Sequence, residues 1–345
     1  MTKTVNNFVQ SVKDRGFRGT LKRIFSIYLK NTLLKYPKLI MYPEDLMIEP
    51  TSICNLRCPL CSNKTMARKK GSMTLKQFKY IIDNYPIKIK RMIIGNSGEP
   101  LVNKDVFKMI KYASSKGTQI RMPTNALLFD KFSVDDVLNS GLYAMNISFD
   151  GVSKKTYEQY RVGSNFERVL KNVTKLCHEK RKRGLKYPII TLQFLVMKHN
   201  EHEVEKMREL AKNIKPDYVF FKSPALWTTL TNDDRDKLAQ RWLPSDKRYW
   251  RYNKDLIIKD PVKLCPFVFD KVVILWNGDV CLCCMDFEGQ FIFGNIFEQS
   301  FKKIFFGRKI HKIRKMISKN KLGFCKECDL VNQKTFGEKI SYRDL

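Results

Sequence analysis

Three cysteines stand close together in the segment Cys54-Asn-Leu-Arg-Cys58-Pro-Leu-Cys61. Three thiolates in so short a loop can wrap one iron–sulfur cluster and ligate three of its irons. A structural cluster or a structural zinc ion normally takes four protein ligands. The loop therefore leaves one coordination position for a ligand from outside the protein. A zinc site that borrows a fourth residue from elsewhere in the chain is the alternative interpretation.

The chain has ten cysteines in 345 residues, and several gather at positions 281–284 and 325–328. In a short secreted protein such clusters would indicate disulfide bonds. This chain is long, and its first seven residues show no apolar signal-peptide region. We therefore interpret the clusters as ligands of metal ions or iron–sulfur clusters, and we expect a cytoplasmic protein.

Six short apolar runs alternate with segments of helical period, and these elements must position the cysteine loop. The runs predicted as strands are Leu46–Pro50, Arg91–Gly95, Gln119–Pro123, Tyr143–Phe149, Ile189–Met197 and Tyr218–Phe221. The predicted helices are Thr74–Asn84, Val106–Ser115, Val134–Ser140, Phe166–Arg183 and Val204–Asn213. Successive βα units build a parallel sheet, and six are fewer than the eight that close a barrel. The sequence predicts an α/β fold, an open partial (β/α)6 barrel, with the cysteine loop directly after its first strand.

Around this barrel we divide the chain into five parts. They are residues 1–43, 44–222, 223–264, 265–330 and 331–345. The first part is basic and amphipathic and predicts a helical extension. That extension either packs on the body of the protein or touches an anionic membrane surface or a lipid-linked substrate.

The parts that follow the barrel differ from it in composition. Residues 223–264 contain Trp242, Trp250 and Tyr252 and are interpreted as an aromatic-rich connector that packs on the barrel mouth. The cysteine module 265–330 has a hairpin that turns at Asn277-Gly278, and a basic helix around Phe301–Ser318. The last part is predicted to be a polar tail, poorly ordered at its end.

Charge is the strongest bias in the composition. Lysine and arginine number 65 against 34 aspartates and glutamates, a formal net charge of +31. One interpretation is a solvated lysine-rich surface, and the other is an anionic partner such as a phosphorylated or nucleotide-linked substrate. No pattern of paired Cys/His fingers or aromatic RNP motifs indicates a nucleic-acid partner. No apolar run reaches the roughly 18 residues of a transmembrane segment.

The cysteine loop and its position resemble the radical SAM (S-adenosylmethionine) superfamily, over roughly residues 46–222. Further segments at successive strand ends carry the resemblance: Gly98-Glu99-Pro100, Thr124-Asn125, Ser148-Phe149-Asp150-Gly151 and, later, Arg161. The resemblance implies that the first segment receives the SAM amino group on its backbone. It also implies that Asn125 lies in the SAM site, that Ser148 and Asp150 reach the ribose or methionine, and that Arg161 pairs with the SAM carboxylate.

The C-terminal module resembles the SPASM/twitch extension of this superfamily. The resemblance is carried by four segments: Cys265-Pro-Phe, Trp276-Asn-Gly-Asp-Val-Cys-Leu-Cys283-Cys-Met-Asp286, Gly294-Asn295-Ile296 and Cys325-Lys-Glu-Cys328. It implies one auxiliary [4Fe–4S] cluster, since the two-cluster pattern needs further cysteines after Cys328. A structural zinc ion or a purely structural cluster is the alternative for this module.

For the auxiliary cluster we assign the ligands Cys265, Cys283, Cys325 and Cys328. Cys283 is chosen because Gly278 stands five residues before it, as in the family's turn–strand element. Cys281 and Cys284 stay open as alternatives. Cys281 is the stronger of the two, because alternate residues of a strand share a face.

The resemblance also implies the chemistry. One electron, from a donor such as flavodoxin or ferredoxin, lets the SAM-bound cluster cleave SAM to methionine and a 5′-deoxyadenosyl radical. That radical abstracts a hydrogen atom from the substrate. Our first hypothesis is the oxidation or rearrangement of a small polar molecule, such as a sugar or an alcohol, with the auxiliary cluster accepting an electron.

Three other hypotheses are weighed against this one. Peptide maturation is less favoured, because the 45 residues before the first strand are few for a peptide-binding domain. An epimerase would need a hydrogen-atom donor, for which Cys281 and Cys284 are the thiols near the module. A non-catalytic iron–sulfur protein would not need SAM-contact residues on successive strand ends. The sequence assigns no catalytic residue.

Overall fold

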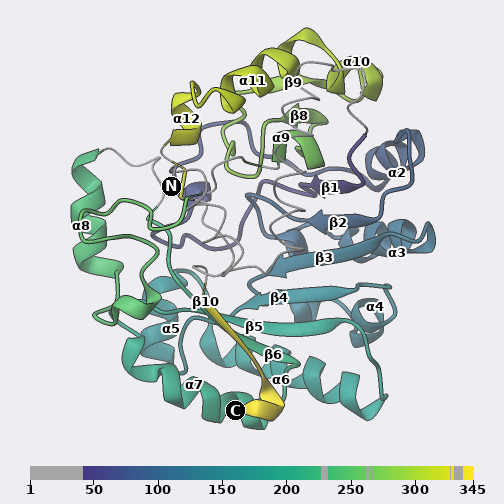
Figure 1. Ribbon diagram of the computed structural model, residues 1–345. Helices are drawn as coiled ribbons and strands as arrows, with labels where there is room; N and C mark the ends of the chain where they lie inside the picture. The colour runs from purple at the N-terminus through teal and green to yellow at the C-terminus, as the bar shows by residue number, and fades with distance from the viewer. Residues whose placement is uncertain (1–41, 227–231, 262–264, 266, 327, 330–336) are drawn as a thin grey trace, which may run out of the picture.

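A single mixed sheet organises the protein (Figure 1). The computed structural model describes residues 42–226, 232–261, 265, 267–326, 328–329 and 337–345, so the N-terminal extension expected over residues 1–43 lies almost wholly outside the described residues. The first six strands are β1 (Asp45–Ile48), β2 (Arg91–Ile94), β3 (Gln119–Thr124), β4 (Ala144–Ser148), β5 (Ile189–Leu195) and β6 (Tyr218–Lys222). They pair in chain order, and every pair among them is parallel. The open partial (β/α)6 barrel expected from the sequence is confirmed.

Helices connect these strands and cover the outer face of the sheet (Figure 1). They are α2 (Leu75–Asn84), α3 (Val106–Ser115), α4 (Val134–Leu138), α5 (Lys154–Tyr160), α6 (Phe166–Lys182) and α7 (Val204–Ile214). Thr74 and Ser133 begin α2 and α4 with capping boxes, in which each hydroxyl accepts a hydrogen bond from a main-chain N–H of the first turn. Such caps stabilise a helix by about 1 kcal/mol each, so serine and threonine are preferred at the first position of a helix. This preference made the two helix starts recognisable in the sequence.

The two faces of the sheet have different packing. Residues such as Ile48, Ile94 and Phe221 belong to the large buried core beneath the helices. The opposite, inner face carries the alternate residues of each strand, and many of these are partly exposed. Near β1 the inner face is closed by a second, smaller apolar cluster that contains Met47 and Cys281.

The C-terminal module extends the same sheet beyond β1. Strand β7 (Lys271–Ile274) pairs parallel with β1, and β8 (Asp279–Cys281) and β9 (Ile292–Asn295) follow antiparallel. The expected hairpin at Asn277-Gly278 is confirmed by the antiparallel pairing of β7 with β8. Gly278 has a φ of 89°, a backbone conformation that favours glycine. The short helices of the module are α9 (Phe267–Asp270), α10 (Phe301–Phe305), α11 (Arg308–Ser318) and α12 (Gly323–Lys326).

Three expectations from the sequence need correction. The basic helix around Phe301–Ser318 is two helices, which separate at Phe306 and Gly307. The connector contains a helix, α8 (Asn232–Trp242), that its aromatic and proline content did not reveal. The end of the polar tail is ordered: β10 (Gly337–Ser341) pairs antiparallel with β6 and forms one edge of the sheet. Its main-chain hydrogen bonds to β6 supply the order that its polar side chains do not.

Two aromatic residues of the connector contact the neighbouring parts of the protein. The Trp242 side chain is buried and meets the ring of Tyr160 edge-on at a centroid distance of 5.4 Å. Tyr252 is also buried and donates a hydrogen bond to Asp329 in the module. The connector therefore joins the barrel mouth to the C-terminal module. Within the described residues, no helix has both the length and the apolar content needed to cross a bilayer.

Candidate active site

The cysteine loop begins where β1 ends, at the carboxyl edge of the sheet. Its shape comes from main-chain hydrogen bonds: Cys61 N donates to Cys58 O at 3.1 Å, and Arg57 N donates to Val162 O at 2.9 Å. The Cys54 sulfur accepts a hydrogen bond from Leu56 N at 3.4 Å. The loop is thereby folded back on itself, with Cys58 buried and Cys54 and Cys61 partly exposed.

Arg161 and Asp150 form a buried ion pair beside this loop. Asp150 is fully buried, and its Oδ2 accepts a hydrogen bond from Arg161 Nε at 2.5 Å while Oδ1 accepts one from Leu195 N at 2.6 Å. The Arg161 Nη1 atom lies 3.6 Å from the Cys58 sulfur. Asp150 thus orients the guanidinium group toward the cysteine loop, and its own oxygens already accept two protein donors.

The segment Gly98-Glu99-Pro100 follows β2 and faces the same loop. The buried Glu99 carboxylate accepts hydrogen bonds from Thr124 Oγ1 at 2.6 Å, from Asn125 N at 2.8 Å and from Leu101 N at 3.1 Å. Burial raises the pKa of Glu99, and these hydrogen bonds act against that rise. Pro100 starts a short 3₁₀ turn for which Glu99 is the cap. Glu99 therefore fastens the ends of β2 and β3 to each other.

Gly98 shows how closely this segment approaches the loop. A Cβ at Gly98 would lie 2.2 Å from the Thr51 carbonyl oxygen, so only glycine fits there. Asn125 donates from Nδ2 to Asn55 Oδ1 at 2.9 Å, which ties the end of β3 to the loop as well. Ser148 ends β4 and is partly exposed. The structure thus gathers all the predicted SAM-contact residues along one edge of the sheet.

Buried polar atoms around this edge lack partners within the described residues. They are Asn55 Nδ2 in the cysteine loop, and Asn96 Nδ2 and Ser97 Oγ just before Gly98. Buried polar groups are nearly always hydrogen-bonded in native proteins. Three such atoms within one site therefore fit a polar ligand such as SAM, seated between the loop and the Gly98 segment.

The state of the thiols also fits a bound cluster. Burial raises the pKa of Cys54 to about 12, so a thiolate at this position needs stabilisation by iron or by positive charge. Arg161 supplies such charge at Cys58, although burial still raises the pKa of that thiol. Among the described residues, no three His, Cys, Asp or Glu side chains converge as the ligands of a single metal ion do.

Four cysteines of the C-terminal module share one cavity. Cys265, Cys283, Cys325 and Cys328 all line a space of about 340 Å³, together with residues such as Phe324. These are the four cysteines assigned from the sequence. Burial raises the pKa of the Cys284 thiol, and the nearby thiols of Cys265 and Cys328 add to that rise, so Cys284 is their neighbour.

Cys281 belongs to different surroundings. It is buried in the small apolar cluster with Met47, and its sulfur lies 3.7 Å from the Cys283 carbonyl oxygen. Strand β8 ends at Cys281, so Cys283 lies beyond the strand and the shared-face argument for Cys281 does not apply. The cavity therefore favours Cys283, with Cys284 as its structural rival.

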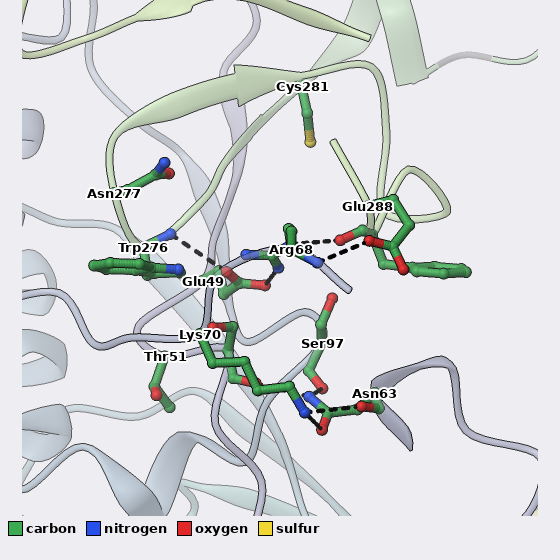
Figure 2. A network of polar contacts seen from close by, with 12 residues as sticks. Glu49, Thr51, Asn63, Arg68, Lys70, Ser97, Trp276, Asn277, Cys281 and Glu288 are labelled. Atoms are coloured by element: carbon green, nitrogen blue, oxygen red, sulfur yellow. Dashed lines mark hydrogen bonds and ion pairs between the residues drawn. The ribbon is translucent and has the colours of Figure 1, made fainter. Parts of the chain in front are cut away.

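A polar network joins the cysteine loop to the module (Figure 2). Glu49, at the end of β1, is fully buried and pairs with Arg68 at 2.5 Å. The main-chain N–H groups of Ala67 and Arg68 donate to the Glu288 carboxylate, and Trp276 N donates to Glu49 at 3.4 Å. Residues far apart in the sequence thus hold the two cysteine-bearing regions together.

The same network continues into the Gly98 segment. Lys70 Nζ donates to the Asn63 carbonyl and side-chain oxygens at 3.0 and 3.1 Å. Asn63 Nδ2 then donates to the carbonyl oxygens of Ser52 and Ser97, at 2.7 and 2.8 Å (Figure 2). Asn63, two residues after Cys61, therefore clamps the cysteine loop to the segment that precedes Gly98.

Two family models match this chain. Residues 48–211 match the radical SAM superfamily, and residues 265–329 match the SPASM iron–sulfur cluster-binding domain. The chain is a radical SAM protein with a C-terminal SPASM domain. The radical SAM domain implies SAM and a [4Fe–4S] cluster as cofactors, and the SPASM domain implies auxiliary iron–sulfur binding.

Similar proteins agree with this assignment. AdoMet-dependent heme synthase from Methanosarcina barkeri is 30% identical over 201 residues, which cover 57% of this chain and 54% of the synthase. A tungsten-containing aldehyde ferredoxin oxidoreductase cofactor-modifying protein from Pyrococcus furiosus is 24% identical, and the match covers 83% of this chain and 87% of that protein. The crystal structure of Streptococcus suis SuiB bound to S-adenosylmethionine shares the fold, with a TM-score of 0.58 at 17% identity over 91% of this chain and 79% of SuiB.

This chain spans only about half the length of the first of these relatives. The activity of the whole protein is therefore proposed below and is not inferred from these relatives. Several residues of the site were missed in the sequence, namely Glu49, Asn63, Arg68 and Glu288. Glu49 stands at a strand end just before the cysteine loop, and this position is the one sequence signal that could have identified it as a site residue. The contacts of the other three depend on tertiary packing.

Proposed function

We propose that this protein cleaves SAM reductively and abstracts a hydrogen atom from a small polar substrate, which it oxidises. The observation that carries the proposal is the pairing of two unlike cysteine sites. Cys54, Cys58 and Cys61 supply three ligands for one cluster. The four cysteines that line the module cavity supply the complete ligand set of a second, which suits a cluster that transfers electrons without binding a ligand.

When bound and reduced, the first cluster supplies the electron that converts SAM into methionine and the hydrogen-abstracting 5′-deoxyadenosyl radical. The protein's own residues bind SAM and orient it. The backbone at Gly98 and the unpartnered atoms of Asn96 and Ser97 offer sites for the polar groups of SAM. Arg161, held by Asp150, places a positive charge beside Cys58, where it also suits the SAM carboxylate. We assign Asp150 the role of positioning Arg161, because its oxygens already accept protein donors.

Oxidation is favoured over epimerisation by the position of Cys281. An epimerase needs a hydrogen-atom donor beside the substrate, and the Cys281 thiol is buried in an apolar cluster and directed at a carbonyl oxygen. In an epimerase, Cys284 would then have to be the hydrogen-atom donor. Peptide modification is the second candidate, since PqqA peptide cyclase from Bradyrhizobium diazoefficiens is 24% identical over 176 residues. We further propose a cytoplasmic location with a flavodoxin or ferredoxin as electron donor, because these clusters need a reducing environment.

Anaerobic reconstitution tests the proposal. The wild-type protein should bind about eight irons per chain, the content of two [4Fe–4S] clusters. With SAM and dithionite it should release 5′-deoxyadenosine. An iron content of about four would remove the auxiliary cluster and with it the oxidation mechanism. Failure to form 5′-deoxyadenosine would overturn the proposed activity altogether.

A further inference from the structure

One stretch of the C-terminal module carries charge of a single sign. Residues 301–326, which hold helices α10, α11 and α12, contain ten lysines and arginines and no aspartate or glutamate. On the barrel, by contrast, surface cations pair with nearby acids, as Lys108 does with Asp105. Positive charge on this side of the module is therefore not balanced by acids of the same stretch, and it would attract a negatively charged partner.

Four of these cations form a stripe along α11, which we call the α11 stripe. They follow one another at intervals of four, three and four residues: Arg308, Lys312, Lys315 and Lys319, the last being the C-cap residue. Residues at such intervals lie on one side of a helix, and all four are exposed. Like charges at this spacing repel one another and weaken a helix. The stability of α11 itself therefore does not explain the stripe.

The opposite side of α11 is occupied by the core of the protein. Ile310 is buried, and Ile313 and Ile317 pack against the same apolar cluster. Among the described residues, no exposed large apolar side chain belongs to α10, α11 or α12. A helix that lies in a membrane surface needs an apolar face to insert. Since α11 presents charge alone on its outer side, it favours an acidic soluble protein over a membrane as its partner.

The α11 stripe leads to the cavity of the four module cysteines. Asn320, the residue after Lys319, lines that cavity, and so does Lys326 of α12. Cys325 lines it too and is partly exposed, so the cavity reaches the protein surface. Ile257 of the connector also lines the cavity, and its side chain is 63% exposed. An exposed apolar side chain beside polar and charged neighbours is typical of a protein–protein contact.

We propose that the α11 stripe and Ile257 form the docking surface for an acidic electron-carrier protein at the mouth of the module cavity. This inference rests on the proposed function, because the oxidation delivers one electron per turnover to the module, and that electron must pass to an outside acceptor. An oxidised carrier takes up this electron and departs in its one-electron-reduced form. Its carboxylates would pair with the stripe while its apolar surface covers Ile257. Opposite charges would also speed the encounter.

Binding of a fluorescently labelled, oxidised flavodoxin of net negative charge, and separately of an acidic ferredoxin, tests the surface. Each probe is titrated anaerobically with the reconstituted protein, and fluorescence anisotropy gives the dissociation constant. Wild type should bind at least one carrier saturably at low salt, and physiological salt should weaken that binding at least tenfold. The variant Lys312→Glu/Lys315→Glu/Lys319→Glu should weaken it at least tenfold at low salt. Arginine at the same three positions should retain most of the affinity.

The matched control reverses three exposed lysines of α6: Lys171→Glu/Lys175→Glu/Lys182→Glu. It makes the same change in net charge, and α6 lies at the opposite end of the molecule from α11 (Figure 1). Its affinity for the carrier should stay within twofold of wild type. Ile257→Ser should weaken binding severalfold and leave its salt dependence unchanged, because this substitution removes apolar contact and no charge.

The inference is overturned if wild type binds neither carrier, or if the α11 variant binds as tightly as wild type. It is also overturned if the α6 control loses as much affinity as the α11 variant, because total charge alone would then attract the carrier. Binding to phosphatidylserine vesicles without binding to either carrier would assign the stripe to a membrane and contradict the proposal. If the α11 variant fails to take up iron, Lys315→Gln and Ile257→Ser decide, and unchanged binding in both contradicts the docking surface.

Formation of 5′-deoxyadenosine with dithionite, which needs no carrier, is measured on the same wild-type samples. Its absence would overturn the proposed function, whereas its presence without carrier binding would overturn the docking surface alone.

Discussion

The two cysteine sites are built in opposite ways. Cys54, Cys58 and Cys61 come from one loop, and main-chain hydrogen bonds within and beside that loop set their arrangement. The four cysteines of the second site come from three segments between residues 265 and 328, and they meet only when the module folds. The first site also adjoins buried polar atoms that have no partner in the described part of the chain, as a ligand-binding site would. The comparison teaches that the local site has the features expected for an outside ligand, whereas the dispersed one would enclose a cluster among four cysteines.

The largest effect expected from one substitution concerns Arg161, which lies at the local site. Arg161→Met leaves the fully buried Asp150 without its ion-pair partner and should cost about 3–5 kcal/mol of unfolding free energy. Urea unfolding followed by tryptophan fluorescence measures this loss. Arg168→Met is the control: its pair with Asp130 is exposed, and its removal should cost under about 1 kcal/mol. Equal losses in the two variants would contradict a special role for the buried pair.

The contact between the two sites is tested by Arg68→Met. This substitution strands the buried Glu49 carboxylate, and about 3 kcal/mol of stability should be lost. The expected loss lies at the lower end of the range because Trp276 N also donates to Glu49. Limited proteolysis should then cut first near Glu288, where the loop and the module meet. Cleavage unchanged from wild type would show that the two regions do not depend on this network.

Gly98→Ala should change the local site and spare the dispersed one. The new methyl group would collide with the Thr51 carbonyl oxygen, and forced overpacking of this kind costs about 1–3 kcal/mol. We expect SAM affinity, measured by equilibrium dialysis, to fall about tenfold, the equivalent of 1.4 kcal/mol. Gly323→Ala is the control, since a Cβ there meets no atom within 4 Å. Unchanged SAM binding by Gly98→Ala would remove this segment from the SAM site.

The smallest effect is expected from Cys281→Ala. Cys281 lies in the apolar cluster and outside the module cavity. The reconstituted Cys281→Ala protein should therefore still bind about eight irons per chain. Cys283→Ala, the matched variant two residues away, should fall to about four irons. Cys284→Ala separates the remaining alternative. If Cys281→Ala lost iron and Cys283→Ala did not, the ligand assignment would be wrong.

The contrast between local and dispersed features also decides what the sequence could predict. The cysteine loop, the six strands and the caps at Thr74 and Ser133 depend on neighbouring residues, and their bounds were predicted closely. Strand β10 was missed because its order comes from pairing with the edge of β6, and Ile340 is the single large apolar side chain in it. The break at Gly307 was missed because the helical period of apolar residues continues on both sides of it.

The candidate site follows the same division. Residues at strand ends, such as Glu99 and Asp150, were assigned through the family resemblance of the segments that contain them. The protein partners of these residues were not predicted: the contact of Asp150 with Arg161, eleven positions later, appears only in the folded chain. The contact of Ala67 with Glu288 spans 221 positions, and no local pattern encodes such a pair.

The central claim is that the local loop, and not the module, holds the cluster that cleaves SAM. The most direct test is 5′-deoxyadenosine release by a Cys54→Ala/Cys58→Ala/Cys61→Ala triple variant, reconstituted anaerobically and supplied with SAM and dithionite. We predict that the variant retains about four irons per chain in the module and releases no 5′-deoxyadenosine above the protein-free background. Release equal to that of wild type would contradict the account.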